Sequence, residues 1–176
     1  MRSFVFFCLL AASGTSVWAE APEVPSNTPY IVLSDNLDEP NGYGFCLDTA
    51  GRNLTDLLHA HSCKPVRNNS TQPSDTQFTY DAVNKRVESV AYPGVCMQVL
   101  ISPYITVFGL LECSDHARQK FDLSADDKTL RMVEDPSKCV GVSETTVRAG
   151  PWVRRDLVLT TCSDADAART QWTFAE

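Results

Sequence analysis

Short runs of alternating apolar and polar residues recur along the chain from about residue 30 onward. Alternation with a period of two residues is typical of β-strands that bury one face. Turn-forming pairs separate these runs, at Asn41-Gly42, Pro93-Gly94, Asp126-Asp127 and Gly150-Pro151. Beyond the N-terminal segment no window of the sequence has a helical stripe, so the pattern predicts an all-β protein.

The strand pattern occurs three times in the same phase. In each unit an alternating run begins at a cysteine, at residues 46–49, 96–99 and 139–142. A later apolar run in the same unit ends at a second cysteine, at residues 57–63, 107–113 and 157–162. An aromatic residue follows each pair of runs, at Phe78, Phe121 and Trp172, and further strands are expected at 87–90 and 130–133. A single unit of this size cannot bury its apolar face alone. We therefore predict a β-trefoil of three similar four-strand repeats, at about residues 30–80, 81–123 and 124–176, rather than a sandwich or a propeller.

The cysteines keep the same phase as the strands. Cys8 lies in the N-terminal segment, and the other six form an even set, as expected of disulfides in an exported chain. Because equivalent positions should behave alike, the repeat predicts one disulfide within each unit: Cys46–Cys63, Cys96–Cys113 and Cys139–Cys162. Each would stabilise the fold by roughly 3 kcal/mol. The alternative, free or zinc-binding cysteines, lacks a Cys-x-x-Cys spacing.

The N-terminal segment has the anatomy of a secretory signal. Arg2 precedes an apolar run at residues 4–12, and Val17-Trp18-Ala19 offers small residues for cleavage. We predict a signal peptide at residues 1–19 and a secreted, extracellular protein, a retained signal anchor being the rival interpretation. Residues 20–29 are proline-rich and are expected to form a flexible leader.

Charge and missing motifs exclude several function classes. The chain has a net charge of −7 and no cluster of Lys and Arg, which argues against binding to nucleic acid or to an anionic membrane surface. No Gly-x-Ser-x-Gly or His-Glu-x-x-His motif is present, and no free thiol is paired with a histidine. The expectation is a protein that is not an enzyme and needs no cofactor.

Three motifs in this phase resemble the ricin B-chain type (R-type) lectins. The first repeat opens with Cys46-Leu47-Asp48, as repeats of that family do. The family's Gln-x-Trp motif is matched by Gln119-Lys120-Phe121, and in altered form by Thr76-Gln77-Phe78 and Thr170-Gln171-Trp172. The resemblance covers residues from about 30 to the C-terminus. It implies a β-trefoil and binding of galactose-like sugars.

The resemblance also implies where a sugar would bind. Family sites place a carboxylate two residues after the first cysteine, a stacking residue two before the second, and Asn or Asp three before the motif aromatic. The first repeat has Asp48, His61 and Asp75 at these places, the second has Gln98, Leu111 and Arg118, and the third has Gly141, Thr160 and Arg169. Only the first repeat keeps plausible ligands for terminal galactose or N-acetylgalactosamine. Without an aromatic platform we expect millimolar affinity, about −4 kcal/mol.

Other interpretations remain open at this point. Loss of the stacking aromatics also suits a trefoil that no longer binds sugar and acts on a protein partner, as an inhibitor or an interaction module. Asp48 is alternatively a turn residue that bonds its own backbone. His59, His61 and Cys63 share one strand face, but a metal site there is disfavoured because Cys63 is better used in a disulfide. Glycosylation sequons begin at Asn53, Asn68 and Asn69.

Overall fold

The computed structural model describes residues 21–22, 29–50, 57–64, 75–162 and 167–175. The predicted signal peptide at 1–19 and the sequons at Asn53, Asn68 and Asn69 lie outside the described residues. No helix in the described part of the chain is long and apolar enough to cross a membrane.

The described residues form short strands and two single 3₁₀ turns. The first repeat contains β1 (Tyr30–Leu33), β2 (Phe45–Thr49), β3 (Leu58–Ser62) and β4 (Phe78–Asp81). The second contains β5 (Arg86–Ser89), β6 (Val95–Ile101), β7 (Thr106–Glu112), η1 (Ala117–Gln119) and β8 (Phe121–Leu123). The third contains β9 (Leu130–Met132), β10 (Lys138–Val142), β11 (Val147–Ala149), β12 (Trp152–Thr161), η2 (Ala167–Arg169) and β13 (Trp172–Ala175).

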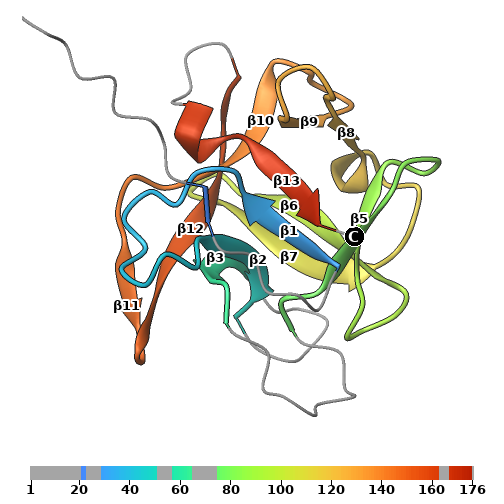
Figure 1. Ribbon diagram of the computed structural model, residues 1–176. Coiled ribbons are helices and arrows are strands. Elements are labelled where there is room, and N and C mark those ends of the chain that lie inside the picture. The colour runs from blue at the N-terminus through green and yellow to red at the C-terminus, as the bar shows by residue number, and fades with distance from the viewer. Residues whose placement is uncertain (1–20, 23–28, 51–56, 65–74, 163–166, 176) are drawn as a thin grey trace, which may run out of the picture.

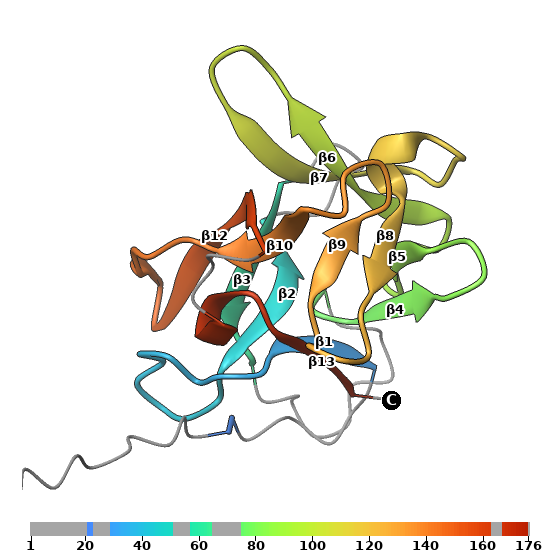
Figure 2. The same ribbon diagram turned by 90° about the horizontal axis from the view of Figure 1, so that it is seen from above.

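Strand pairing follows the threefold repeat. The last strand of each repeat pairs antiparallel with the first strand of another, as β4–β5, β8–β9 and β13–β1, so the three repeats join in a ring. The two middle strands of each repeat form a hairpin, as β2–β3, β6–β7 and β10–β12. Figures 1 and 2 show these hairpins disposed around the barrel strands. The prediction of an all-β trefoil is confirmed.

Equivalent backbone contacts recur in each repeat. Each first cysteine pairs with the preceding barrel strand, as Cys46 with Val32, Cys96 with Glu88 and Cys139 with Arg131. The disulfides join Cys46 to Cys63, Cys96 to Cys113 and Cys139 to Cys162, as the repeat alignment predicts, with Cα–Cα distances of 4.9, 4.9 and 5.1 Å. The cysteines therefore fix the register of the two strands of every hairpin.

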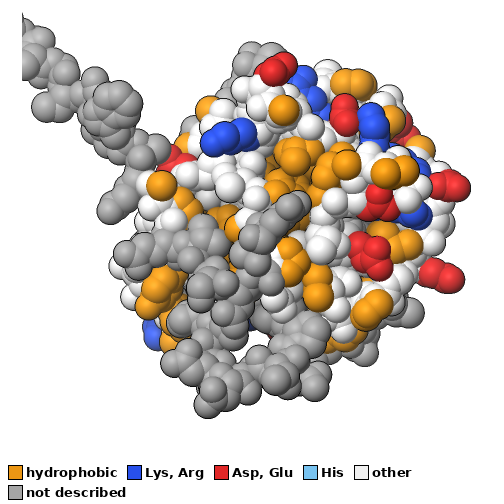
Figure 3. All heavy atoms as spheres, turned by 45° about the vertical axis from the view of Figure 1, so that its right-hand side comes forward, with side chains coloured by type: hydrophobic (Ala, Val, Ile, Leu, Met, Phe, Trp, Pro, Cys, Tyr) orange, Lys and Arg blue, Asp and Glu red, His pale blue; other side chains and the backbone are white. Residues whose placement is uncertain are grey.

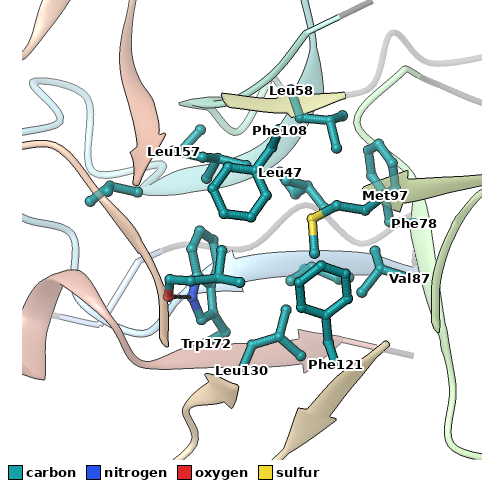
Figure 4. Packing of buried hydrophobic residues seen from close by; sticks show 14 of the residues in the cluster. Leu47, Leu58, Phe78, Val87, Met97, Phe108, Phe121, Leu130, Leu157 and Trp172 are labelled. Atoms are coloured by element: carbon teal, nitrogen blue, oxygen red, sulfur yellow. Dashed lines mark hydrogen bonds between the residues drawn. The ribbon is translucent and has the colours of Figure 1, made fainter. Parts of the chain in front are cut away.

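The core draws on side chains from all three repeats. The motif aromatics Phe78, Phe121 and Trp172 are buried there, together with Met97 and Phe108, and Figure 4 shows these side chains meeting in one cluster. Burying each such side chain stabilises the fold by roughly 1.5–3 kcal/mol. The indole of Trp172 also donates a hydrogen bond of 2.9 Å to the carbonyl of Val140, which satisfies its one polar atom.

The repeats differ in their hairpins. In the hairpin of the second repeat both strands are long, with seven residues in each of β6 and β7. The hairpin of the first repeat has five residues in each of β2 and β3. Figure 2 shows the β6–β7 hairpin projecting from the rest of the molecule. The third repeat adds β11, which pairs with the first half of the ten-residue strand β12. The scaffold is thus common to the repeats, and the differences lie at the hairpins.

Candidate functional site

The β2–β3 hairpin carries a polar face that turns away from the core. Leu47, Leu58 and Ala60 point into the core cluster. Because side chains alternate along a strand, the intervening Asp48, His59 and His61 point to the other face. Asp48 lies directly opposite His59 in the antiparallel register.

Lys64 joins this face to the segment before β4. The Lys64 Nζ lies 2.8 Å from Asp48 Oδ2 and 3.7 Å from Asp75 Oδ1. The same Asp48 oxygen lies 3.8 Å from His59 Nε2 and 3.9 Å from His61 Nδ1. The three residues expected from the sequence, Asp48, His61 and Asp75, therefore lie in one cluster, with the Lys64 ammonium between the two carboxylates.

The members of the cluster differ in exposure. The side chain of Asp48 is 0% exposed and that of His61 is 7% exposed, whereas Lys64 is 34% and Asp75 29% exposed. A ligand arriving from solvent would therefore meet Lys64 and Asp75 first. Asp48 lies behind the ammonium group of Lys64.

The electrostatics of the cluster follow from this burial. Burial raises the pKa of Asp48, but the His59 ring and the Lys64 ammonium outweigh it and hold that pKa below its ordinary value. Burial lowers the pKa of His61, and Lys64 and His59 add to this effect, against the opposing influence of Asp48 and of the Ser62 carbonyl. At neutral pH Asp48 is therefore a carboxylate and His61 a neutral imidazole, whose Nδ1 lies 3.0 Å from the Ser62 carbonyl.

The cluster is suited to hydrogen bonding with a polar neutral ligand. Lys64 presents an ammonium donor and Asp75 a carboxylate acceptor, a pairing that suits adjacent hydroxyl groups. The face does not assemble the metal site considered from the sequence, because Cys63 is used in the disulfide with Cys46.

The equivalent position in the second repeat is occupied by an amide network. Gln98 accepts a hydrogen bond of 3.0 Å from Gln119 Nε2, which also donates to the Glu112 carbonyl at 2.9 Å. The Gln119 carbonyl oxygen accepts from the Ser114 backbone N–H at 2.8 Å, and its side chain is 1% exposed. The motif glutamine here ties three segments together.

The third repeat closes the same position by packing. A Cβ atom on Gly141 would lie 3.0 Å from the Arg169 carbonyl oxygen and 3.0 Å from Thr170 Cγ2. The Arg169 side chain forms an ion pair of 3.1 Å with Glu144. A side chain at this position would therefore crowd the Arg169 carbonyl and Thr170.

Two cluster residues were not predicted from the sequence. Lys64 follows the second cysteine, at the place that Ser114 and Ser163 occupy in the other repeats, so the repeat alignment marks it as the only charged residue at that position. His59 shares a strand face with His61, but its place directly opposite Asp48 depends on the strand register, in which Cys46 lies opposite His61 and not opposite Cys63. The repeat alignment therefore singles out Lys64 but not His59.

A separate hollow of about 330 Å³ lies near the C-terminal strand. It is lined by Pro29, Tyr30, Phe78, Thr79, Tyr80, Phe174 and Ala175. The Tyr80 and Phe174 rings meet edge to face, 5.5 Å apart, and the Tyr80 hydroxyl donates to the Phe121 carbonyl. Figure 3 shows hydrophobic side chains gathered in the middle of this side of the molecule. The hollow contains none of the predicted sugar ligands.

Comparison with known proteins reveals relatives in fold. No family model and no curated protein sequence matches the chain. The β-trefoil lectin of the Vibrio vulnificus hemolysin/cytolysin, with bound N-acetyl-D-lactosamine, is similar with a TM-score of 0.53 and 15% identity, over 83% of this chain and 91% of that chain. A mutant of the earthworm lectin C-terminal domain, in complex with 6'-sialyllactose, has a TM-score of 0.52 and 10% identity, over 84% and 98%. The solution structure of the mdaA-1 domain has a TM-score of 0.55 and 14% identity, over 92% and 97%. The chain thus has the β-trefoil fold seen in lectins.

Proposed function

We propose that the protein is a secreted carbohydrate-binding protein that is not an enzyme and binds galactose-like sugars weakly through its first repeat. The observation that carries this proposal is a single cluster in which Asp48 lies beside His61 and Lys64, and Lys64 also reaches Asp75. The positions equivalent to Asp48 in the other repeats hold a bonded amide and a glycine without free space. Fold relatives that carry lactosamine and sialyllactose support the same ligand class.

The order of exposure suggests how a sugar would engage this cluster. Asp75 and Lys64 offer an acceptor and a donor at the rim, so they would take the first hydroxyls of a terminal galactose or N-acetylgalactosamine. A small rotation of the Lys64 side chain would then open Asp48 to a second hydroxyl. Neutral His61 would complete the site with its imidazole ring.

Weak affinity follows from the same geometry. The cluster has no Trp or Tyr to stack on the apolar face of a sugar, and Lys64 must give up part of its ion pair. Ordering exposed polar side chains adds a further cost, so we expect a dissociation constant near millimolar, about −4 kcal/mol.

Secretion belongs to the same proposal. Internal disulfides persist in oxidising compartments, and the described chain has one in each repeat. Together with the signal peptide predicted at residues 1–19 they support export. The sequons at Asn53, Asn68 and Asn69 would then be available for glycosylation in a eukaryotic host.

Retention on immobilised sugars tests the proposal. The purified protein should be retarded on galactose and N-acetylgalactosamine columns, and Asp75→Asn and Asp48→Asn should each abolish the retardation. Asp115→Asn is the matched control, because Asp115 pairs with Lys120 at 2.8 Å in the second repeat and is 91% exposed. Equal retention of the wild type and both cluster variants would disprove the assigned site, and no retention on any glycan surface would disprove sugar binding.

A second candidate function is action on a protein partner, as an inhibitor or an interaction module. On this account the trefoil no longer binds sugar. The observation that favours it is the Asp48 carboxylate, which is 0% exposed and already paired with Lys64. On this account the cluster is purely structural. Asp75→Asn would then leave partner binding unchanged. Added sugar would not slow hydrogen exchange of the backbone amides in the cluster.

A further inference from the structure

The tip of the β6–β7 hairpin, residues 101–106, exposes apolar side chains to solvent. Tyr104 is 97% exposed, Ile105 60% and Ile101 47%. The tip is an ordered turn, because the Ser102 N–H donates to the Ile105 carbonyl at 2.9 Å and the Ser102 hydroxyl accepts from the Ile105 N–H at 3.2 Å. An ordered turn loses little conformational entropy on binding. A fully exposed tyrosine on such a turn is suited to anchoring an interface.

The hairpin also lacks charged residues along its length. Among the described residues β7 ends the four-stranded sheet, where it has an isolated bridge between Gly109 and Leu57 and packs against β3 and β12. Soluble proteins commonly place charged residues on such edges to prevent pairing with another chain. Here no Asp, Glu, Lys, Arg or His occurs from Val95 to Leu111. The exposed end of the hairpin is therefore an uncharged surface that a partner could cover.

A hollow of about 680 Å³ adjoins the hairpin tip. Its apolar lining includes Leu57, Ile105, Phe108 and Leu157, contributed by all three repeats. Arg154 and Asp156, which form an ion pair, lie among its polar lining residues. An apolar centre with polar neighbours is the usual composition of a protein interface. The tip and the hollow thus place a knob beside a hole.

We propose that this surface is the interface of a homodimer, in which the Tyr104 tip of each copy enters the hollow of the other. A twofold interface requires one patch that complements itself, and a knob beside a hole meets that requirement. The chain has a net charge of −7, so two copies repel each other least where they meet through the uncharged stretch from Val95 to Leu111.

The same observations disfavour a membrane as the occupant. Peripheral attachment to anionic lipid draws on Lys and Arg near the apolar tip, and the hairpin has none from Val95 to Leu111. A membrane would also leave the hollow beside the tip unfilled. A second copy fills it.

Sedimentation velocity at micromolar to submillimolar concentrations tests this interface. The purified protein should show a reversible monomer–dimer equilibrium, and Tyr104→Ser should raise its dissociation constant by about 30-fold or more, as loss of a central aromatic anchor does. Ile105→Asp, and Leu57→Asp on the side of the hollow, should leave only monomer. All three positions are exposed, so thermal unfolding at a concentration where the wild type is monomeric should stay unchanged and separate loss of dimer from misfolding.

Val83 offers the matched control, because it is 91% exposed on the β4–β5 turn in another part of the molecule. Val83→Asp and Val83→Ser should leave the dimer intact. A wild type that stays monomeric at every concentration would overturn the proposal, as would equal dissociation by Val83→Asp and Ile105→Asp. Binding of a monomeric protein to phosphatidylcholine vesicles, lost in Tyr104→Ser, would also overturn it and identify a membrane as the occupant.

Discussion

The first and second repeats place different chemistry at one strand position. Two residues after the first cysteine, the first repeat has the buried carboxylate of Asp48 with Lys64, and the second has the amide of Gln98 with Gln119. Both side chains occupy the outer face of a hairpin that a disulfide holds in register. The amide network is neutral and complete. The carboxylate needs an exposed cation, and that difference makes the first repeat a candidate site and the second a piece of scaffold.

The largest effect on stability is expected when the carboxylate of the first repeat is introduced at the equivalent position of the third repeat. Gly141→Asp places the first repeat's residue in the third repeat, where a Cβ already lies 3.0 Å from the Arg169 carbonyl and Thr170. Overpacking and an unpaired buried charge should lower the free energy of unfolding by about 4 kcal/mol. Urea unfolding would measure the loss. Gly150→Asp measures backbone strain without crowding, because its φ of +65° disfavours a side chain while no atom lies within 4 Å of its added Cβ; we expect it to cost about 1 kcal/mol. Equal losses for the two variants would contradict this account of the third repeat.

The second prediction concerns the amide network of the second repeat. Gln119→Ala removes the partner of Gln98, the Glu112 carbonyl and the Ser114 N–H at once. Leaving such groups unpaired in a buried setting should cost about 3 kcal/mol of unfolding free energy. Urea unfolding measures this, and Gln119→Glu provides a variant of similar shape. A loss under about 1 kcal/mol would mean that water replaces the network.

The third prediction separates the two partners of the first repeat's ion pair. Lys64→Met leaves the fully buried Asp48 without its cation, whereas Asp48→Asn leaves a lysine that is 34% exposed and can reach water. We expect Lys64→Met to cost about 2–3 kcal/mol and Asp48→Asn about 1 kcal/mol. Lys85→Met should cost less than about 1 kcal/mol, because its pair with Asp122 is exposed on both sides. The reverse order of the two cluster variants in urea unfolding would contradict the assigned burial.

The smallest effect is a pH dependence specific to the first repeat. Burial lowers the pKa of His61 in the folded protein, so below the unfolded value of about 6.5 the unfolded chain takes up more protons and stability falls. Asp48, whose pKa is also lowered, contributes a further loss only below its own unfolded value of about 3.9. The unfolding free energy should therefore decline as pH falls below about 6.5. His61→Gln should flatten that decline, and His116→Gln, at an exposed position in the second repeat, should not.

The scaffold was predictable because its signals are local and occur three times. Period-two alternation, the breakers between strands and the phase of the cysteines all reflect backbone geometry that each repeat must satisfy. The full burial of Asp48 was not predictable in the same way. Asp48 shares a strand face with the buried Cys46, but Gln98 has the same position relative to the buried Cys96 and is only partly buried.

Other features depended on contacts that no local pattern encodes. Lys64 contacts two carboxylates, Asp48 and Asp75, that are far apart in the sequence. The extra strand β11 arises because β12 extends well before the run that alternation marks. The hollow beside the β6–β7 tip combines side chains from all three repeats. Such features come from the assembly of the repeats and not from any one of them.

The most direct test of the central claim is a sugar titration followed residue by residue. Proton–nitrogen correlation spectra of the labelled protein should be recorded with increasing methyl galactoside or N-acetylgalactosamine, and with glucose as the control sugar. We predict saturable shifts with a dissociation constant near millimolar, confined to the amides around Asp48, His61, Lys64 and Asp75. Absence of shifts with either sugar, or shifts centred on Gln98 or Gly141, would contradict the account.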